Sequence, residues 1–189
     1  LGLGTFWDVK SGKELFKTKK HKERTYGVAF APDGNMFATA VDDGSIRLWD
    51  VATGTELRKF QTTDRIHNCH PVAFSSDGKT LAAGSGKTIR LWNLETGDKP
   101  LVIEKAHLRE VISIVFTPDG KALISSGLHY ENIAQRGYRS VGQIRFWDPN
   151  TGKQLRELKS EDSHLGPCSM TLSRDGTILA SVHHDSIRI

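Results

Sequence analysis

The chain has 189 residues, a formal net charge of +4 and 37% apolar residues. A chain of this length and composition can bury a hydrophobic core, which excludes intrinsic disorder as the default state. It has no apolar stretch of the roughly 18 residues that a membrane-spanning helix needs and no secretory h-region at its start, and its two cysteines are too few for a disulfide scaffold.

Short β-strands separated by turns are predicted along the whole chain, the first at residues 5–8. The pattern is clearest farther on, where apolar and β-branched residues predict strands at 26–30, 36–40, 45–50 and 56–60. Gly34 and Gly54 follow Asp or Thr between these strands and can supply the positive φ of a tight turn. No segment keeps a helical apolar period over roughly eleven residues. The sequence therefore predicts an all-β chain of antiparallel strands.

The strands recur as a repeat of about 43 residues. Tryptophan, followed by Asp or Asn, occurs at Trp7, Trp49, Trp92 and Trp147, with spacings of 42, 43 and 55. Asp-Gly pairs that begin at Asp33, Asp77, Asp119 and Asp175 are spaced by 44, 42 and 56. Both series have one longer interval at the same place, so one structural unit recurs and one copy carries an insertion.

Four antiparallel strands that end in Trp-Asp are typical of a propeller blade. The segments Asp43–Asp50 and Thr88–Asn93 carry this pattern most clearly, and through them the chain resembles WD-repeat β-propellers. The resemblance implies an all-β propeller of four-stranded antiparallel blades. The chain would supply an incomplete ring of about four blade-equivalents and would associate with the remaining blades of a longer chain.

The repeat alignment predicts the limits of each blade. They are 1–19 for the end of a blade, 20–61 and 62–105 for two complete blades, 106–160 for a blade with an insertion at 128–141, and 161–189 for a partial blade. A slice of this kind would expose strand edges and blade interfaces. We therefore expect the isolated segment to associate with itself.

The resemblance also implies a buried hydrogen-bond network of His, Ser or Thr, Asp and Trp within a blade. The predicted members are His21, Thr39, Asp43 and Trp49 in the first complete blade, His107, Ser125 and Trp147 in the third, and His164, Ser181 and Asp185 in the last. The second complete blade has Arg65 and Ala83 at the His and Ser/Thr positions. A buried indole N–H needs an acceptor, which such a hydroxyl supplies.

Neither catalysis nor metal binding is predicted. Thr39, His21 and Asp43 resemble a catalytic triad, but a nucleophile must be accessible and these residues are assigned to the interior. The His67-Asn68-Cys69-His70 and His183-His184-Asp185 segments lack the paired spacing of a structural zinc site. Two unpaired thiols weakly favour a reducing, intracellular compartment. No cofactor is expected.

The insertion is the candidate partner-binding segment, and a variable loop without a binding role is the alternative. It is read as a long loop between the second and third strands, and repeat insertions map to loops on one face. The candidate residues are Tyr130, Arg136, Tyr138 and Arg139 in the insertion and Arg24, Asp42, Arg65, His67, Arg109 and Glu110 on neighbouring loops. Tyr and Arg are enriched in binding hot spots.

The predicted function is a non-catalytic scaffold that presents loop faces to protein or peptide partners. A charge of +4 without interleaved aromatic residues makes nucleic acid an improbable partner, and no membrane association is expected. Two alternatives remain open. One is a sensor or targeting propeller fused to a catalytic domain such as a protein kinase, and the other is a propeller enzyme with an active site in the central channel.

Overall fold

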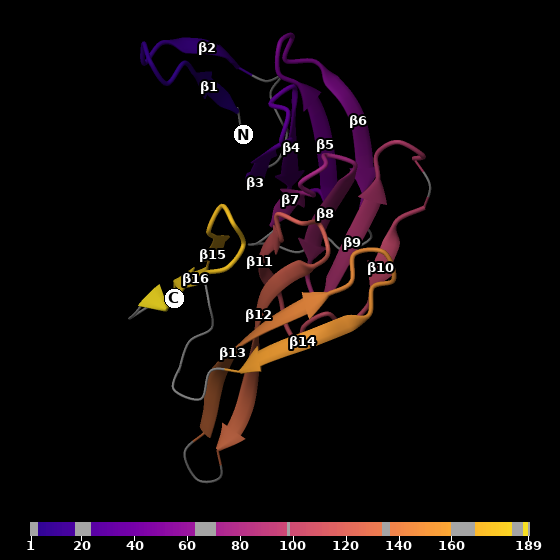
Figure 1. The fold of residues 1–189 in the computed structure, drawn as a ribbon, viewed down its shortest axis with the longest axis vertical. Helices are drawn as coiled ribbons and strands as arrows, with labels where there is room; N and C mark the ends of the chain where they lie inside the picture. The colour runs from indigo at the N-terminus through magenta and orange to yellow at the C-terminus, as the bar shows by residue number, and fades with distance from the viewer. Residues whose placement is uncertain are drawn as a thin grey trace.

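The regular structure of this chain consists of strands. The computed structural model describes residues 4–17, 24–62, 71–97, 99–133, 137–159, 169–182 and 187–188, and every helix or strand assigned within them is a strand (Figure 1). The all-β class predicted from turn residues and strand composition is therefore confirmed. No helix that could cross a membrane occurs in these ranges.

The strands form five antiparallel sheets. The first pairs β1 (Thr5–Trp7) with β2 (Glu14–Lys17). Three four-stranded sheets follow in chain order. They consist of β3 (Thr25–Phe30), β4 (Met36–Val41), β5 (Ser45–Asp50) and β6 (Glu56–Gln61); of β7 (Val72–Phe74), β8 (Thr80–Ser85), β9 (Thr88–Asn93) and β10 (Leu101–Ile103); and of β11 (Val111–Phe116), β12 (Leu123–Ile133), β13 (Gly137–Trp147) and β14 (Gln154–Lys159). The last contains β15 (Ser169–Leu172), β16 (Leu179–Val182) and β17 (Ile187–Arg188).

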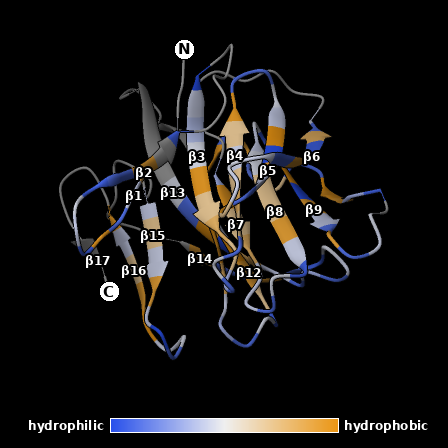
Figure 2. Ribbon diagram, turned by 90° about the horizontal axis from the view of Figure 1, so that it is seen from above, coloured by the Kyte–Doolittle hydropathy of each residue, from blue (hydrophilic) through white to orange (hydrophobic). Residues whose placement is uncertain are grey.

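Each complete sheet is a meander of strands that are consecutive in sequence. The four predicted strands of the first complete sheet agree with β3 to β6 to within one residue at each end. Tight turns join them, and Gly44, between β4 and β5, has a φ of 76° that an L-residue rarely adopts. Figure 2 shows hydrophobic residues along the strands and hydrophilic residues on the joining turns.

The sheets are arranged around their first strands. β3 contacts β7, β7 contacts β11, and β11 contacts β15. The sheets therefore fan out from a shared centre as propeller blades do, with β6, β10 and β14 on the outside (Figure 1). Among the described residues, no strand joins the sheet of β1 and β2 to that of β15 to β17, so the ring is incomplete.

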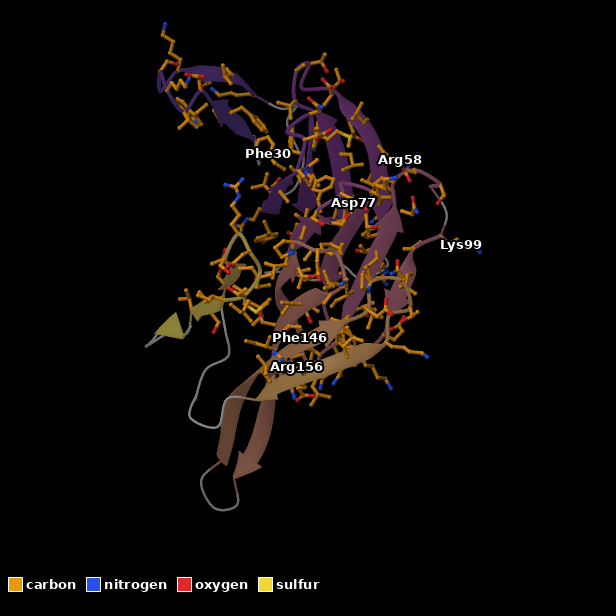
Figure 3. The ribbon with its side chains drawn as sticks, in the orientation of Figure 1. Phe30, Arg58, Asp77, Lys99, Phe146 and Arg156 are labelled. Carbon is orange, nitrogen blue, oxygen red and sulfur yellow. The ribbon has the colours of Figure 1, made fainter. Side chains whose placement is uncertain are left out.

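Two hydrophobic clusters fill the space between the complete sheets. One joins the sheet of β3 to β6 with that of β7 to β10 and includes Leu48 and Trp92. Phe60 packs on the Trp92 ring at 5.2 Å between centroids, and the Arg58 guanidinium lies 5.7 Å from the Phe60 ring. A similar contact on the third complete sheet places Arg156 4.5 Å from the Phe146 ring (Figure 3).

The insertion is not a loop, so that prediction is wrong. β12 and β13 pair in continuous register from Leu123↔Trp147 to Ile133↔Gly137 and form a hairpin that projects from the molecule (Figure 1). β11 and β14 accompany this hairpin only as far as Gly127 and Gln143. The extra residues lengthen two existing strands, because their backbones satisfy one another's hydrogen bonds.

Candidate interaction site

A buried tryptophan hydrogen bond supports the first complete sheet. The Trp49 indole Nε1–H donates to Thr39 Oγ1 at 2.9 Å, and both residues are buried. His21, the predicted next member, lies outside the described residues. Asp43 accepts hydrogen bonds from the Ser45 amide at 2.8 Å and from its hydroxyl, and lies 3.4 Å from Arg47 Nη2. Asp43 therefore holds the turn between β4 and β5.

The Asp43 carboxylate is stabilised in its charged form. Partial burial opposes the charge, but the hydrogen bonds from Ser45 and the cations of Lys59 and Arg47 outweigh this effect. The pKa of Asp43 is consequently lower than the usual value for Asp. A carboxylate engaged in this way is a structural group and not a free general base.

The third complete sheet contains a longer hydrogen-bond chain. Trp147 Nε1–H donates to Ser125 Oγ at 2.8 Å, and Ser125 Oγ lies 2.7 Å from His107 Nε2. The Ser125 hydroxyl can accept from the indole and donate to Nε2, and in that arrangement the neutral imidazole carries its hydrogen on Nδ1. Burial and the nearby Arg145 cation lower the pKa of His107 to about 3.

This arrangement is unsuited to nucleophilic catalysis. Ser125 and His107 are both 0% exposed, so a substrate cannot reach the hydroxyl. Ser181 in the last sheet is also buried, whereas His164 and Asp185 lie outside the described residues. Ala83 stands on β8 in the second complete sheet, whose Arg65 position is likewise not described.

Several candidate partner-binding residues lie at the ends of strands that share one face. Asp42, at the end of β4, donates its backbone N–H to the Arg24 carbonyl at 2.8 Å. Exposed Arg109 and Glu110 lie just before β11, where Val111 N–H donates to the Gly86 carbonyl of the β8–β9 turn at 2.7 Å. These positions belong to the face from which the long hairpin rises.

The hairpin candidates can be placed only by register. Tyr130 is opposite Ser140, Tyr138 is opposite Asn132, and Arg139 is opposite Glu131. The structure describes the backbone at positions 130, 138 and 139 and not their side chains. Arg136, Arg65 and His67 lie outside the described residues.

Residues 104–110 form a loop whose central residues are buried and whose last three residues are exposed. Arg145 Nη1 donates to the Ala106 carbonyl at 2.7 Å, and the next residue, His107, bonds Ser125. The following residue, Leu108, is 55% exposed, and Arg109 and Glu110 are exposed after it. The buried contacts thus hold an apolar and two charged side chains beside the root of the hairpin.

Sequence reasoning missed Leu108 and the Arg145 contact. One signal was available for the latter, because Arg47, Arg90 and Arg145 each stand two residues before the repeat tryptophan. A guanidinium that recurs at a position otherwise suited to a strand interior indicates a polar contact across the sheet. Nothing comparable marks Leu108.

No group of three or more His, Cys, Asp or Glu residues suited to a metal ion occurs within the described ranges. The His67-Asn68-Cys69-His70 and His183-His184-Asp185 segments fall outside these ranges.

Comparison with known proteins identifies the repeat. The family model for the WD domain, G-beta repeat, matches residues 12–50 and 54–93. Guanine nucleotide-binding protein subunit beta of Arabidopsis thaliana is 31% identical over 62% of this chain and 33% of that protein. Serine-threonine kinase receptor-associated protein of Gallus gallus is 26% identical over 95% of this chain and 57% of that protein.

A third relative, the small ribosomal subunit protein RACK1 of Schizosaccharomyces pombe, is 31% identical over 56% of this chain and 35% of its own length. The chain therefore spans between about one third and somewhat over one half of these relatives. Residues 12–50 and 54–93 therefore carry WD repeats, and the four tryptophan-centred repeats and radial four-stranded sheets have the arrangement of WD-repeat β-propeller blades.

Proposed function

We propose that this chain is part of a non-catalytic scaffold that holds protein or peptide partners on one propeller face. Relatives support this proposal, since their names describe one as a subunit of a guanine nucleotide-binding protein, one as associated with a receptor, and one as a ribosomal subunit protein. Each name places the relative in an assembly with other macromolecules. A rigid blade array that presents several loops side by side suits that role.

The observation that carries the proposal is the exposed triplet 108–110 beside the projecting hairpin. Ala106 and His107 are fully buried, and hydrogen bonds from Arg145 and to Ser125 hold them in place. The exposed residues that follow are thereby preorganised, which lowers the entropic cost of binding. Exposed Leu108 and Arg109 supply the apolar and charged contacts that protein interfaces use.

Shortening the hairpin tests the proposal. In the variant, residues 130–140 are replaced by Asn-Gly, which joins the paired positions His129 and Val141 through a two-residue turn. Affinity capture with quantitative mass spectrometry should show loss of partners that the unmodified protein retains. The melting temperature should stay unchanged, because β11 and β14 do not pair with the removed segment.

Lys121→Ala is the matched control. Lys121 is 85% exposed in the turn between β11 and β12, at the opposite end of the same sheet. The control should retain every partner. Identical partner sets for the shortened and unmodified proteins would refute the assignment of this face.

A further inference from the structure

Two buried polar atoms beneath the hairpin lack hydrogen-bond partners among the described residues. They are Nδ1 of His107 and Oε1 of Gln143. His107 is 0% exposed and Gln143 is 5% exposed, so bulk water does not satisfy them. In the tautomer in which Ser125 Oγ–H donates to His107 Nε2, the imidazole hydrogen is on Nδ1, and Gln143 Oε1 is an acceptor. Nδ1–H therefore needs an acceptor, and Oε1 can supply one.

Gly127 brings the two side chains together. Gly127 on β12 is directly opposite Gln143 on β13. His107 packs on the Gly127 backbone, with Nδ1 only 2.5 Å from the place where a Cβ at residue 127 would stand. Directly opposite residues have Cβ positions about 5 Å apart, so the imidazole lies within reach of the Gln143 side chain on the same face of the sheet.

The other half of the Gln143 amide fixes its orientation. Gln143 Nε2–H donates to Glu157 Oε1 on β14 at 3.3 Å. Because β14 and β12 flank β13 on opposite sides, an amide nitrogen directed to β14 leaves the oxygen for the β12 side. His107 occupies that side.

We propose that Gln143 is a positioning residue whose Oε1 accepts a hydrogen bond from His107 Nδ1–H when the two side chains turn towards each other, a bond that the present structure does not contain. With the Arg145 contact to the Ala106 carbonyl, this bond latches residues 104–110 to the strand that continues into the hairpin. The first complete sheet has Ser45 four residues before its tryptophan, where this sheet has Gln143, and Ser45 bonds Asp43. The second complete sheet has Thr88 at this position, so among the three complete sheets the latch is particular to the one with the long hairpin.

The proposed latch adds a structural detail to the proposed function. Only its expected effect on partner binding rests on that function. The latch joins the exposed triplet 108–110 and the hairpin root through one buried residue pair. A change at position 143 should therefore loosen the loop without altering any exposed side chain.

A crystal structure of the unmodified protein tests the bond directly. The expected separation of Nδ1 and Oε1 is about 2.7–3.2 Å. A separation beyond about 4 Å, or a water molecule between the two atoms, would overturn the proposal.

Gln143→Leu removes the acceptor, and Gln154→Leu is its matched control. Gln154 begins β14, is exposed, and also donates to Glu157, at 3.5 Å. Hydrogen exchange of the amides of residues 107–111 should be about tenfold faster, or more, in Gln143→Leu and unchanged in Gln154→Leu. Equal exchange in both variants would overturn the latch. If Gln143→Leu fails to fold, the crystallographic distance decides.

Partner capture separates the two proposals. Loss of partners in both Gln143→Leu and the shortened hairpin supports both. Loss only on shortening the hairpin overturns the positioning role of Gln143 and leaves the proposed function intact. If neither variant loses partners while exchange still accelerates, the proposed function fails and the latch stands as a structural device.

Discussion

Individual side chains explain why the two tryptophan networks differ. Asp43 stands six residues before Trp49, in the turn between β4 and β5, where its carboxylate caps the Ser45 amide. Val141 stands six residues before Trp147, but there it is inside β13 and pairs with His129. A carboxylate that caps a turn has no role where the strand runs straight on, so lengthening the hairpin removed the need for Asp.

The buried His107 predicts a specific dependence of stability on pH. Its pKa is about 3 in the folded chain, against an ordinary value of 6.5, so below pH 6.5 the unfolded chain binds a proton that the folded chain does not. The free energy of unfolding should therefore fall as the pH decreases from about 6.5 towards 3, by up to about 1.4 kcal/mol per pH unit. The charged groups beside the ring are Arg145 and, through Arg145, Glu157.

Urea unfolding at pH 7 and pH 5 measures this effect above the range in which the carboxylates titrate. The loss of stability between these pH values should be about 2 kcal/mol smaller in His107→Gln than in the unmodified protein. NMR provides the direct check, since the ring signals of His107 should not move between pH 8 and pH 5. A midpoint near 6.5 for those signals would contradict the burial argument.

At the scale of the strand, prediction succeeded where the strand is buried in the core. β4 and β5 are buried at most positions, Phe37 and Ile46 among them, and the apolar and β-branched composition of residues 36–40 and 45–50 revealed both strands. The extension beyond Gly127 is flanked by neither β11 nor β14, so it has no sheet around it to impose such a pattern. A polar sequence that pairs only through its backbone lacks the apolar pattern of a strand. The insertion was therefore predicted as a loop.

The loop before β11 contains a strained residue whose relief is measurable. Lys105 has a φ of 53°, in the left-handed region that glycine adopts without penalty. Lys105→Gly should raise the free energy of unfolding by about 0.5–1 kcal/mol, because relief of strain outweighs the added freedom of the unfolded chain. Chemical denaturation measures the change.

Lys87→Gly is the control for this prediction. Lys87 is also exposed in a turn between strands, but its φ is not positive. Glycine there should lower the free energy of unfolding, by about 0.5–1 kcal/mol. The same sign of change in both variants would contradict the strain argument.

At the scale of the whole molecule, the repeat period predicted the sheets but not the contacts between them. A Cβ on Gly78 would stand 3.6 Å from Cδ of Pro32, in the turn of the preceding sheet. A Cβ on Gly176 would stand 2.8 Å from Cδ of Pro118. Repetition of a motif indicates that sheets stack, whereas the fit of turn against turn depends on three-dimensional geometry. Gln143 and His107 were hidden for the same reason, since 36 residues separate them and only the fold brings both to Gly127.

An apolar groove between β1 and β3 leads to the last prediction. It has a volume of about 420 Å³ and is lined by Phe6, Trp7, Val28, Phe30 and Phe37. Val28 is 63% exposed and Phe30 is 53% exposed, in a region where the Phe6 and Phe37 rings pack at a tilt with their centroids 4.4 Å apart. Exposed apolar surface of this kind is an association site, so the 189-residue chain should self-associate in solution.

Val28→Lys places a charge in the lining of the groove and should shift the chain towards monomer, because a desolvated ammonium group opposes contact between two such surfaces. Val9→Lys is the control, since Val9 is 97% exposed in the turn between β1 and β2 and does not line the groove. Sedimentation velocity across a range of protein concentrations measures the association. If the unmodified chain remains monomeric, this groove does not drive self-association. Equal association of the two lysine variants would lead to the same conclusion.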